Sequence, residues 1–335
     1  MDDVAAMQRA INLAHLGLGL TFPNPIVGAV IVDSKGAFIS EGFHQGSEHA
    51  EVIAISAAES IPPGSTLFIS LEPCNHFGKT PPCVDAIINA GISRVVYAID
   101  DPNPVAAGGA DRMKAAGIEV ISGIGAASAE FVNRDWLTKI RKKRPRIIWK
   151  IASTMDGIIS AADGTSMWIT SEASREDVAK MRSQSDAILT STGTVIADNP
   201  LLTSKGFGKN PIRIVMGMRN IELSAKVRST DAETLFIQSH RVEDLLKILA
   251  DRGFNQIMIE SGPTFGTALL KERLVDEIVL FQAPTFLGAG TNSIGDLGIK
   301  SLSDRRDFKI AQIESIGTDV KITLLADDFE GMGEN

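Results

Sequence analysis

Three side chains with the chemistry of metal ligands stand in the first quarter of the chain. His49 is followed 25 residues later by Cys74, and Cys83 comes nine residues after Cys74. A zinc ion that takes part in chemistry has three protein ligands and keeps a fourth position for water, whereas a structural zinc has four. One histidine and two cysteines leave that position open. Because these are the only two cysteines in the sequence, the pattern predicts a catalytic metal site rather than a disulfide framework.

Glu51 lies two residues after His49, where its carboxylate could move a proton to or from a metal-activated water. Zinc deaminases share the motif H-x-E followed by P-C-x-x-C, in which the glutamate is the general acid and base. The first part matches here, but eight residues, NHFGKTPP, separate the two cysteines instead of two. Two other interpretations stay open: the cysteines are buried free thiols, or His76 completes a structural zinc site.

The elements that must position these residues alternate between helix and strand. Cys74 follows a predicted strand, while His49 and Cys83 each begin a predicted helix, where the positive end of the helix dipole favours a thiolate. The hydrophobic spacing predicts helices over 4–17, 49–60 and 82–91, strands over 25–33, 37–43, 66–73 and 94–100, and a helix and strand over 110–122. This pattern predicts an α/β layered domain.

A second α/β block follows the charge run RKKRPR at 141–146, which is typical of a solvated linker between domains. We therefore predict two domains, 1–144 and 145–335, as expected for 335 residues. Strands are predicted at 146–154, 185–191, 211–217, 233–239, 255–261 and 276–284, with helices at 174–183 and 242–251. No G-x-G-x-x-G motif follows a strand in this half. Gly262 and Gly266 flank a helix start whose free amides could hold a phosphate.

The charge and hydrophobicity of the sequence argue against two classes of partner, nucleic acids and membranes. A net charge of −8 with a pI near 5.3 gives no basic footprint for nucleic acid. No apolar stretch approaches the roughly 18 residues of a membrane span, and the N-terminus lacks the pattern of a secretory signal. We expect a cytoplasmic protein that acts on small molecules, with neither nucleic acid nor membrane as partner.

Several motifs resemble the bifunctional riboflavin-biosynthesis deaminase/reductase family. In the first half these are PNPIVGAVIV (23–32), GFH (42–44), HAEV (49–52), LEPCNHFGKTPPC (71–83) and DPNP (101–104). In the second half they include KIASTMDGIIS (150–160), MRSQSDAILTSTGTVIADNPLLT (181–203) and IESGPTFGTALL (259–270). The resemblance implies a cytidine-deaminase-like α/β/α sandwich followed by a dihydrofolate-reductase-like α/β domain.

The same resemblance implies two reactions. The first is zinc-dependent deamination of 2,5-diamino-6-(5-phosphoribosylamino)pyrimidin-4(3H)-one. The second is NADPH-dependent reduction of the ribosyl group of 5-amino-6-(5-phosphoribosylamino)uracil to ribityl. The family also implies a homodimer or a higher homo-oligomer.

The resemblance further assigns roles to matching positions. In the deaminase, zinc is held by His49, Cys74 and Cys83, Glu51 moves protons, and the substrate is contacted by Asn24, His44, His76, Lys79, Asp101 and Asn103. In the reductase, NADPH is contacted by Ala152, Trp168, Thr194, Asp198, Gly262, Pro263, Thr264, Phe265, Gly266, Thr267 and Ala268. The reductase substrate is contacted by Lys150, Ser166, Arg182, Leu202, Lys205 and Glu260, and Asp198 is also the proposed proton donor.

Three features differ from the family pattern or stay open. Asn75 stands where the family usually has serine, the stretch after DPNP is one residue shorter, and Lys205 replaces an arginine, which would leave a point charge in place of a bidentate phosphate ligand. Trp168 is equally compatible with a core and with a cofactor contact. The alternatives to the bifunctional enzyme are a deaminase of nucleosides or tRNA, a zinc-stabilised scaffold, and an enzyme with one inactive half.

Overall fold

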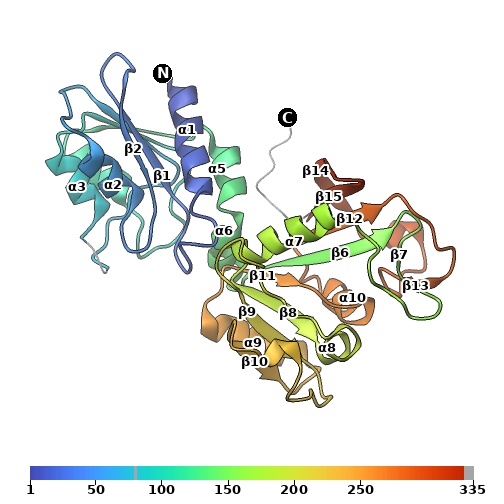
Figure 1. Cartoon of the computed structure of the whole chain (residues 1–335). Helices are drawn as coiled ribbons and strands as arrows, with labels where there is room; N and C mark the ends of the chain where they lie inside the picture. The colour runs from blue at the N-terminus through green and yellow to red at the C-terminus, as the bar shows by residue number, and fades with distance from the viewer. Residues whose placement is uncertain (79–80, 328–335) are drawn as a thin grey trace. The chain divides into compact units, whose positions relative to one another are not determined.

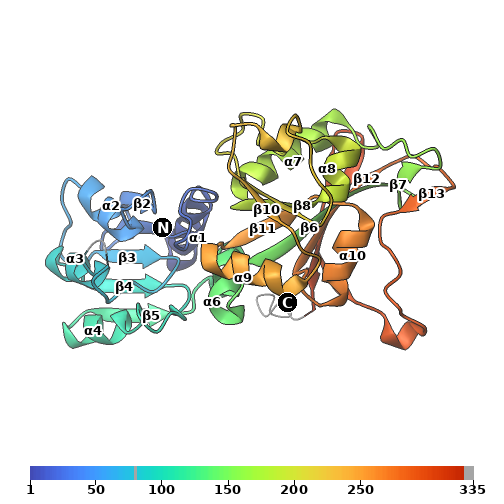
Figure 2. The same cartoon turned by 90° about the horizontal axis from the view of Figure 1, so that it is seen from below.

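The chain forms two compact units, Met1–Lys143 and a second that begins at Arg144. The computed structural model describes residues 1–78 and 81–327. Figures 1 and 2 show both units as mixed α/β structures, which confirms the predicted fold class. Within the described residues, no helix is long and apolar enough to cross a membrane.

The first unit is built on a five-stranded sheet with the strand order β2-β1-β3-β4-β5. The strands are β1 (Gly28–Val32), β2 (Phe38–Phe43), β3 (Thr66–Ile69), β4 (Arg94–Tyr97) and β5 (Glu119–Ser122). β1 runs antiparallel to both of its neighbours, and β3, β4 and β5 are parallel. Every residue of β1 and β3 is buried, as expected for strands covered on both faces of a sheet.

Helices cover both faces of this sheet. They are α1 (Asp3–His15), α2 (Ala50–Ala57), α3 (Cys83–Asn89), α4 (Gly109–Ala115), α5 (Ala126–Val132) and α6 (Arg134–Lys142). α1 and α5 lie on one face, and α2 and α3 on the other (Figure 1). The start of α2 packs closely on β2, because a Cβ added at Gly42 would lie 2.7 Å from the carbonyl oxygen of Ala50.

The second unit contains an eight-stranded sheet with the order β10-β9-β8-β11-β6-β12-β15-β14. The six strands from β10 to β12 are parallel, and β15 and β14 add an antiparallel edge. The strands are β6 (Arg146–Thr154), β8 (Ala187–Ser191), β9 (Ile212–Met216), β10 (Thr234–Ile237), β11 (Gln256–Ile259), β12 (Glu277–Ala283), β14 (Phe308–Ile316) and β15 (Asp319–Ala326). β7 (Ile158–Ala161) and β13 (Gly290–Asn292) form a separate two-stranded sheet.

Figure 2 shows the helices of the second unit on both faces of its large sheet, with α7 and α8 on one side and α9 and α10 on the other. Their bounds are α7 (Glu172–Gln184), α8 (Thr192–Asp198), α9 (Val242–Arg252) and α10 (Pro263–Lys271), and short 3₁₀ turns cover Lys226–Arg228 and Leu302–Asp304. α10 packs closely on β6, because a Cβ added at Gly266 would lie 2.1 Å from the ring of Trp149.

The segment 141–146 has its predicted form of a solvated linker only in part, since residues 141–143 are exposed whereas Pro145 and Arg146 are buried. Arg141 and Lys142 end α6, and Arg146 opens β6. Arg146 is fully buried and pairs with Glu277. The prediction was wrong at this position because a run of cations gives no sign of a buried carboxylate more than a hundred residues away.

Gly266→Ala is expected to destabilise the second unit by about 1–3 kcal/mol, because the added methyl must push into the Trp149 ring. Urea unfolding followed by tryptophan fluorescence measures the change. Gly262→Ala is the matched control, since a Cβ there meets nothing within 4 Å; because Gly262 is the N-cap of α10, the change should cost no more than about 1 kcal/mol. Equal stability of the two variants would contradict the close packing of α10 on Trp149.

Candidate active sites

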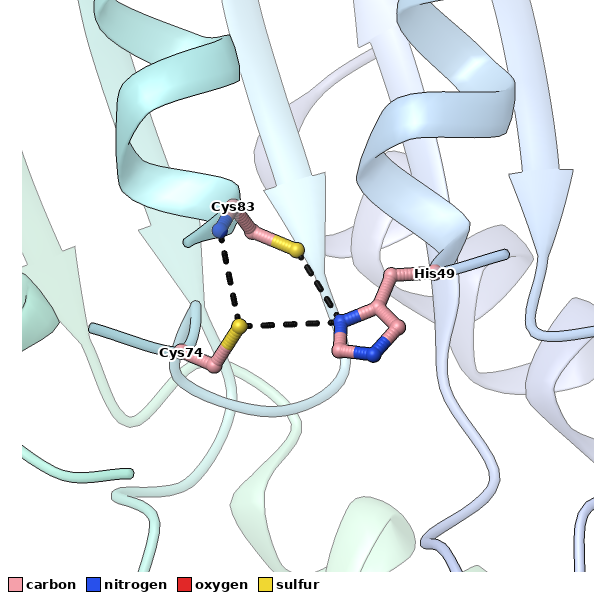
Figure 3. Close-up of side chains that lie close together, drawn as sticks. All are labelled: His49, Cys74 and Cys83. Carbon is pink, nitrogen blue, oxygen red and sulfur yellow. Dashed lines mark hydrogen bonds between the residues drawn. The ribbon is translucent and has the colours of Figure 1, made fainter. Parts of the chain in front are cut away.

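Three segments of the first unit bring the predicted zinc ligands together (Figure 3). His49 is the N-cap of α2, Cys83 is the first residue of α3, and Cys74 lies in the loop after β3. The Nδ1 of His49 lies 3.1 Å from the Sγ of Cys83 and 3.6 Å from the Sγ of Cys74. All three potential ligand atoms lie within 4.8 Å of one another. This donor set fits a tetrahedral zinc with one position left for water.

The two thiols in this cluster have pKa values shifted in opposite directions. A hydrogen bond from the Cys83 thiol, helped by His49, lowers the pKa of Cys74 to about 4 despite its burial. The same pairing and burial raise the pKa of Cys83. The backbone N–H of Cys83 also donates to the Sγ of Cys74 at 3.4 Å. The hydrogen bonds to the Cys74 sulfur favour its thiolate form, the form that binds a metal ion.

Glu51 lies in the first turn of α2, beside the cluster, and is buried. Burial raises the pKa of its carboxyl to about 7, although the neighbouring His49 charge acts in the opposite direction. A carboxyl group that titrates near neutral pH can both accept and donate a proton under physiological conditions. The geometry is therefore that of a metal centre with a proton carrier next to it.

A cavity of about 480 Å³ opens onto these residues. Five predicted substrate residues line it, namely Asn24, His44, His76, Asp101 and Asn103. The sixth, Lys79, lies outside the described residues. His44 bonds through Nδ1 to the carbonyl oxygen of Pro25 at 3.1 Å, and its buried Nε2 meets no hydrogen-bond partner in the described structure. Burial lowers the pKa of His44 and raises that of Asp101 to about 6.

Glu72 is a residue of this site that the sequence analysis did not single out. Its buried carboxylate accepts hydrogen bonds from the backbone N–H of Asp101 at 3.1 Å and of Ala110 at 3.0 Å. It therefore ties the loop that carries Cys74 to the DPNP loop and to α4. The available signal was an acidic residue between a buried strand and a Pro-Cys pair.

Asn75, the departure from the family pattern, also contacts the segment after DPNP. Its amide nitrogen donates to the carbonyl oxygen of Gly108 at 3.4 Å, and its Oδ1 accepts from Arg112 at 3.0 Å. Arg112 pairs in turn with Asp85 of α3. Asn75 and the shortened stretch after DPNP, the two departures from the family pattern in this unit, are thus in contact with each other.

The second unit has a cavity of about 570 Å³ that most of the predicted reductase residues line. They are Lys150, Ala152, Ser166, Trp168, Arg182, Thr194, Asp198, Leu202, Lys205, Glu260 and Gly262. The cavity lies toward the carboxyl ends of β8 and β11, where open parallel sheets bind ligands. Pro263, Thr264, Phe265, Gly266, Thr267 and Ala268 continue into α10 and are not part of its lining. These residues are kept from the cavity because α10 packs against other parts of the unit. Gly266 lies against the Trp149 ring, and the Thr267 hydroxyl accepts a hydrogen bond from the N–H of Gly295.

Three charged side chains form a network in this cavity. Arg182 makes a two-pronged contact with Glu260 at 2.5 and 2.9 Å, and the Nζ of Lys150 lies 3.3 Å from the same carboxylate. Burial alone would raise the pKa of Glu260, but the charges of Arg182 and Lys150 outweigh it and lower that pKa to about 2. The network carries a net charge of +1, which favours an anionic ligand.

Asp198 ends α8 at the same cavity. Burial raises its pKa, against the opposing effects of Lys150 and Ser166. The segment that follows is strained, because Asn199, Leu202 and Lys205 have positive φ angles of 42°, 56° and 51°. Such conformations are costly for side chains other than glycine and cluster at functional sites.

Trp168 is 68% exposed, whereas Trp149 is 1% exposed. The structure therefore excludes Trp168 from the core and places it at the cavity wall. Arg175, which the sequence analysis did not select, lies over its ring and lines the same cavity.

Comparisons with known proteins cover both units. Residues 1–99 match the cytidine and deoxycytidylate deaminase zinc-binding region, and residues 145–322 match the RibD C-terminal domain. The riboflavin biosynthesis protein RibD of Mycobacterium tuberculosis is 40% identical over 96% of both chains. That of Escherichia coli is 38% identical over 97% of this chain and all of its own.

Solved structures agree. The diaminohydroxyphosphoribosylaminopyrimidine deaminase/5-amino-6-(5-phosphoribosylamino)uracil reductase of Thermotoga maritima is 34% identical, with a TM-score of 0.89 over 96% of this chain and 98% of its own. RibD of Acinetobacter baumannii, form 1, also has a TM-score of 0.89, with 34% identity over 97% and 99%.

These matches confirm the predicted order of a cytidine-deaminase-like and a dihydrofolate-reductase-like domain. They also confirm a zinc-dependent deaminase and an NADPH-dependent reductase in one enzyme. The chain belongs to the bifunctional riboflavin biosynthesis deaminase/reductase family.

Proposed function

We propose that the first unit deaminates 2,5-diamino-6-(5-phosphoribosylamino)pyrimidin-4(3H)-one and that the second reduces the ribosyl group of the deaminated product to ribityl. The observation that carries the first assignment is the meeting of His49, Cys74 and Cys83 beside the buried Glu51. The relation to RibD proteins over nearly the whole chain supports the second. We place the boundary between the two domains at residues 144 and 145.

His49, Cys74 and Cys83 would hold the zinc. When bound, zinc supplies a Lewis acid that makes a water nucleophilic near neutral pH. Glu51 takes a proton from the attacking water and delivers one to the departing amino nitrogen, so that one water enters and one ammonia leaves. Its pKa near 7 suits both transfers.

The cavity next to Glu51 offers groups for a polar ring and a phosphate. Asn24, Asp101 and Asn103 can pair with the edges of a pyrimidine. His44 lines the same cavity, and its buried Nε2 has no hydrogen-bond partner in the described structure, so we include it among the substrate residues. His76 and Lys79 are our candidates for the phosphate.

In the second unit, the network of Arg182, Lys150 and Glu260 would meet the substrate, with Arg182 as the phosphate ligand. Ser166, Leu202 and Lys205 complete this substrate set. The nucleotide set comprises Ala152, Trp168, Thr194, Asp198 and Gly262, which line the cavity. Of the segment from Gly262 to Ala268, only the amides at the start of α10 remain candidates for a phosphate.

The reduction adds a hydride from NADPH at C1′ of the sugar and consumes one proton. Asp198 is the proposed source of that proton, since burial raises its pKa and so favours the protonated form.

We also propose that the enzyme works in the cytoplasm as a homodimer or higher homo-oligomer. Zinc binding requires reduced cysteines, and a reducing compartment keeps them so.

One assay tests the two activities together. The purified enzyme is given the diaminopyrimidinone substrate and NADPH, and ammonia release and NADPH absorbance are followed with and without prior chelation of zinc. Chelation should abolish ammonia release. When the deaminated product is supplied directly, chelated enzyme should still oxidise NADPH at an unchanged rate. Loss of this second rate on chelation would contradict two separate sites.

Glu51→Gln is expected to retain zinc but to lower the rate of ammonia release by a factor of about 10²–10⁴, because the amide cannot accept a proton. Metal analysis and the ammonia assay measure the two properties, and the reductase rate on deaminated product serves as the internal control. A variant with normal ammonia release would exclude Glu51 as the proton carrier.

Glu260→Gln is expected to lower the free energy of unfolding at pH 7 by about 3 kcal/mol. The folded-state pKa of Glu260, about 2, is below its ordinary value of 4.5. Its stabilising effect is therefore fully present above pH 4.5 and is lost as the pH falls toward 2. Urea unfolding across this range should show a weaker pH dependence in the variant.

The control for this change is Glu233→Gln, which disrupts an exposed ion pair with Arg252. Such pairs contribute about 0–1 kcal/mol. If both variants lost the same stability, the buried network would not have the energetic role assigned to it.

A further inference from the structure

The segment that carries Trp168 forms part of the wall of the reductase cavity, but little of its apolar surface is buried. It connects β7 to α7, and the side chains of Met167 and Trp168 are 59% and 68% exposed. Both line the cavity together with Asp198 and Gly262. Apolar side chains with this exposure gain little free energy from burial. The place of the indole therefore depends on specific contacts.

Arg175, in the first turns of α7, supplies two such contacts. Its guanidinium carbon lies 4.6 Å from the centre of the Trp168 ring. Its Nη1 donates a hydrogen bond to the carbonyl oxygen of Thr170 at 2.7 Å. A planar guanidinium can stack on an aromatic face while its N–H groups bond in fixed directions. One side chain thus holds both the indole and the backbone two residues farther along.

The backbone after Thr170 is fixed independently. The N–H of Ser171 donates to the buried carboxylate of Asp319 at 2.7 Å, and the hydroxyl of Ser174 donates to the same oxygen at 2.6 Å. α7 therefore begins from a firm anchor, and Arg175 extends from it to the exposed indole. Loss of Arg175 would free Trp168 without removing the anchor of the helix.

We propose that Arg175 is a positioning residue of the reductase site, which holds the Trp168 indole as a wall for an aromatic ring of NADPH. This inference rests on the proposed function, in which Trp168 contacts the cofactor. Arg175 acts through Trp168, so its contribution to NADPH binding exists only while the indole is present.

A double-mutant cycle on the full-length enzyme tests this dependence. NADPH affinity is measured by calorimetry for Arg175→Gln, Trp168→Ala and the double variant. Arg175→Gln should weaken binding about three- to tenfold, and the double variant should bind no more weakly than Trp168→Ala. Additive losses would instead show that Arg175 contacts NADPH directly, which would overturn the positioning role.

The cycle also separates this inference from the proposed function. If Trp168→Ala weakens NADPH binding and Arg175→Gln does not, the inference is wrong while Trp168 remains a cofactor contact. If neither variant changes the affinity, the assignment of Trp168 to the cofactor is wrong as well.

Acrylamide quenching of tryptophan fluorescence reports the indole without any turnover. The other two tryptophans, Trp136 and Trp149, are 6% and 1% exposed, so quenching of the NADPH-free enzyme reports mainly Trp168. Arg175→Gln should increase this quenching, and Arg175→Lys, which keeps the charge but loses the planar stack, should fall between it and the parent. Unchanged quenching in both variants would overturn the inference.

Arg9→Gln is the matched control, because Arg9 stacks on Phe38 at 4.7 Å in the first unit. It should change neither NADPH affinity nor Trp168 quenching. If Arg175→Gln does not fold, Arg175→Lys carries both measurements, with thermal unfolding as the check on its stability.

Discussion

Buried carboxylates at the carboxyl ends of central strands hold both sites together. Glu72 follows β3 and Glu260 follows β11, and each is almost fully buried. An ionised group in such a place is tolerated only when its oxygens are matched by donors. Glu72 is matched by two backbone N–H groups and Glu260 by two cations. The two solutions lead to different kinds of site.

In the first unit, the neutral donors make Glu72 a structural link. Because its partners are backbone amides of Asp101 and Ala110, it fixes the course of two loops without adding cationic charge to the cavity. The remaining charge near the metal cluster is then set by the thiols and by Glu51. In the second unit, the cationic donors around Glu260 leave an excess positive charge, which suits a phosphorylated ligand. The same constraint is thus met by neutral backbone donors in one cavity and by cationic side chains in the other.

Local sequence was sufficient to predict the metal centre but not its supports. His49, Glu51 and Cys83 lie at helix starts, and each of these starts is visible as a change of hydrophobic period. Their convergence on Cys74 followed from the known geometry of zinc sites. Glu72 was missed because its partners are 29 and 38 residues away. The burial of Arg146 was missed for a similar reason, since the carboxylate that pairs with it, Glu277, comes from β12.

The reductase cavity was harder to predict because its shape depends on backbone conformations that sequence pattern does not reveal. Three residues other than glycine adopt left-handed conformations between Asn199 and Lys205, and tertiary contacts must offset their cost. Asn199 accepts a hydrogen bond from the N–H of Lys226 at 2.9 Å. The fully buried Arg213 donates to the carbonyl oxygens of Leu201 and Lys226, two residues that line the cavity.

A guanidinium that satisfies carbonyl groups rather than a carboxylate adds rigidity without neutralising its own charge. Arg213 therefore ties the strained segment to the segment around Lys226 through hydrogen bonds to their carbonyl oxygens. Since the strained segment carries Leu202 and Lys205, its rigidity favours a preorganised cavity wall at these two residues. A lysine at position 205, where the family usually has arginine, is therefore easier for this cavity to tolerate. Arg182 and Lys150 line the same cavity, so its positive charge does not depend on the residue at position 205 alone.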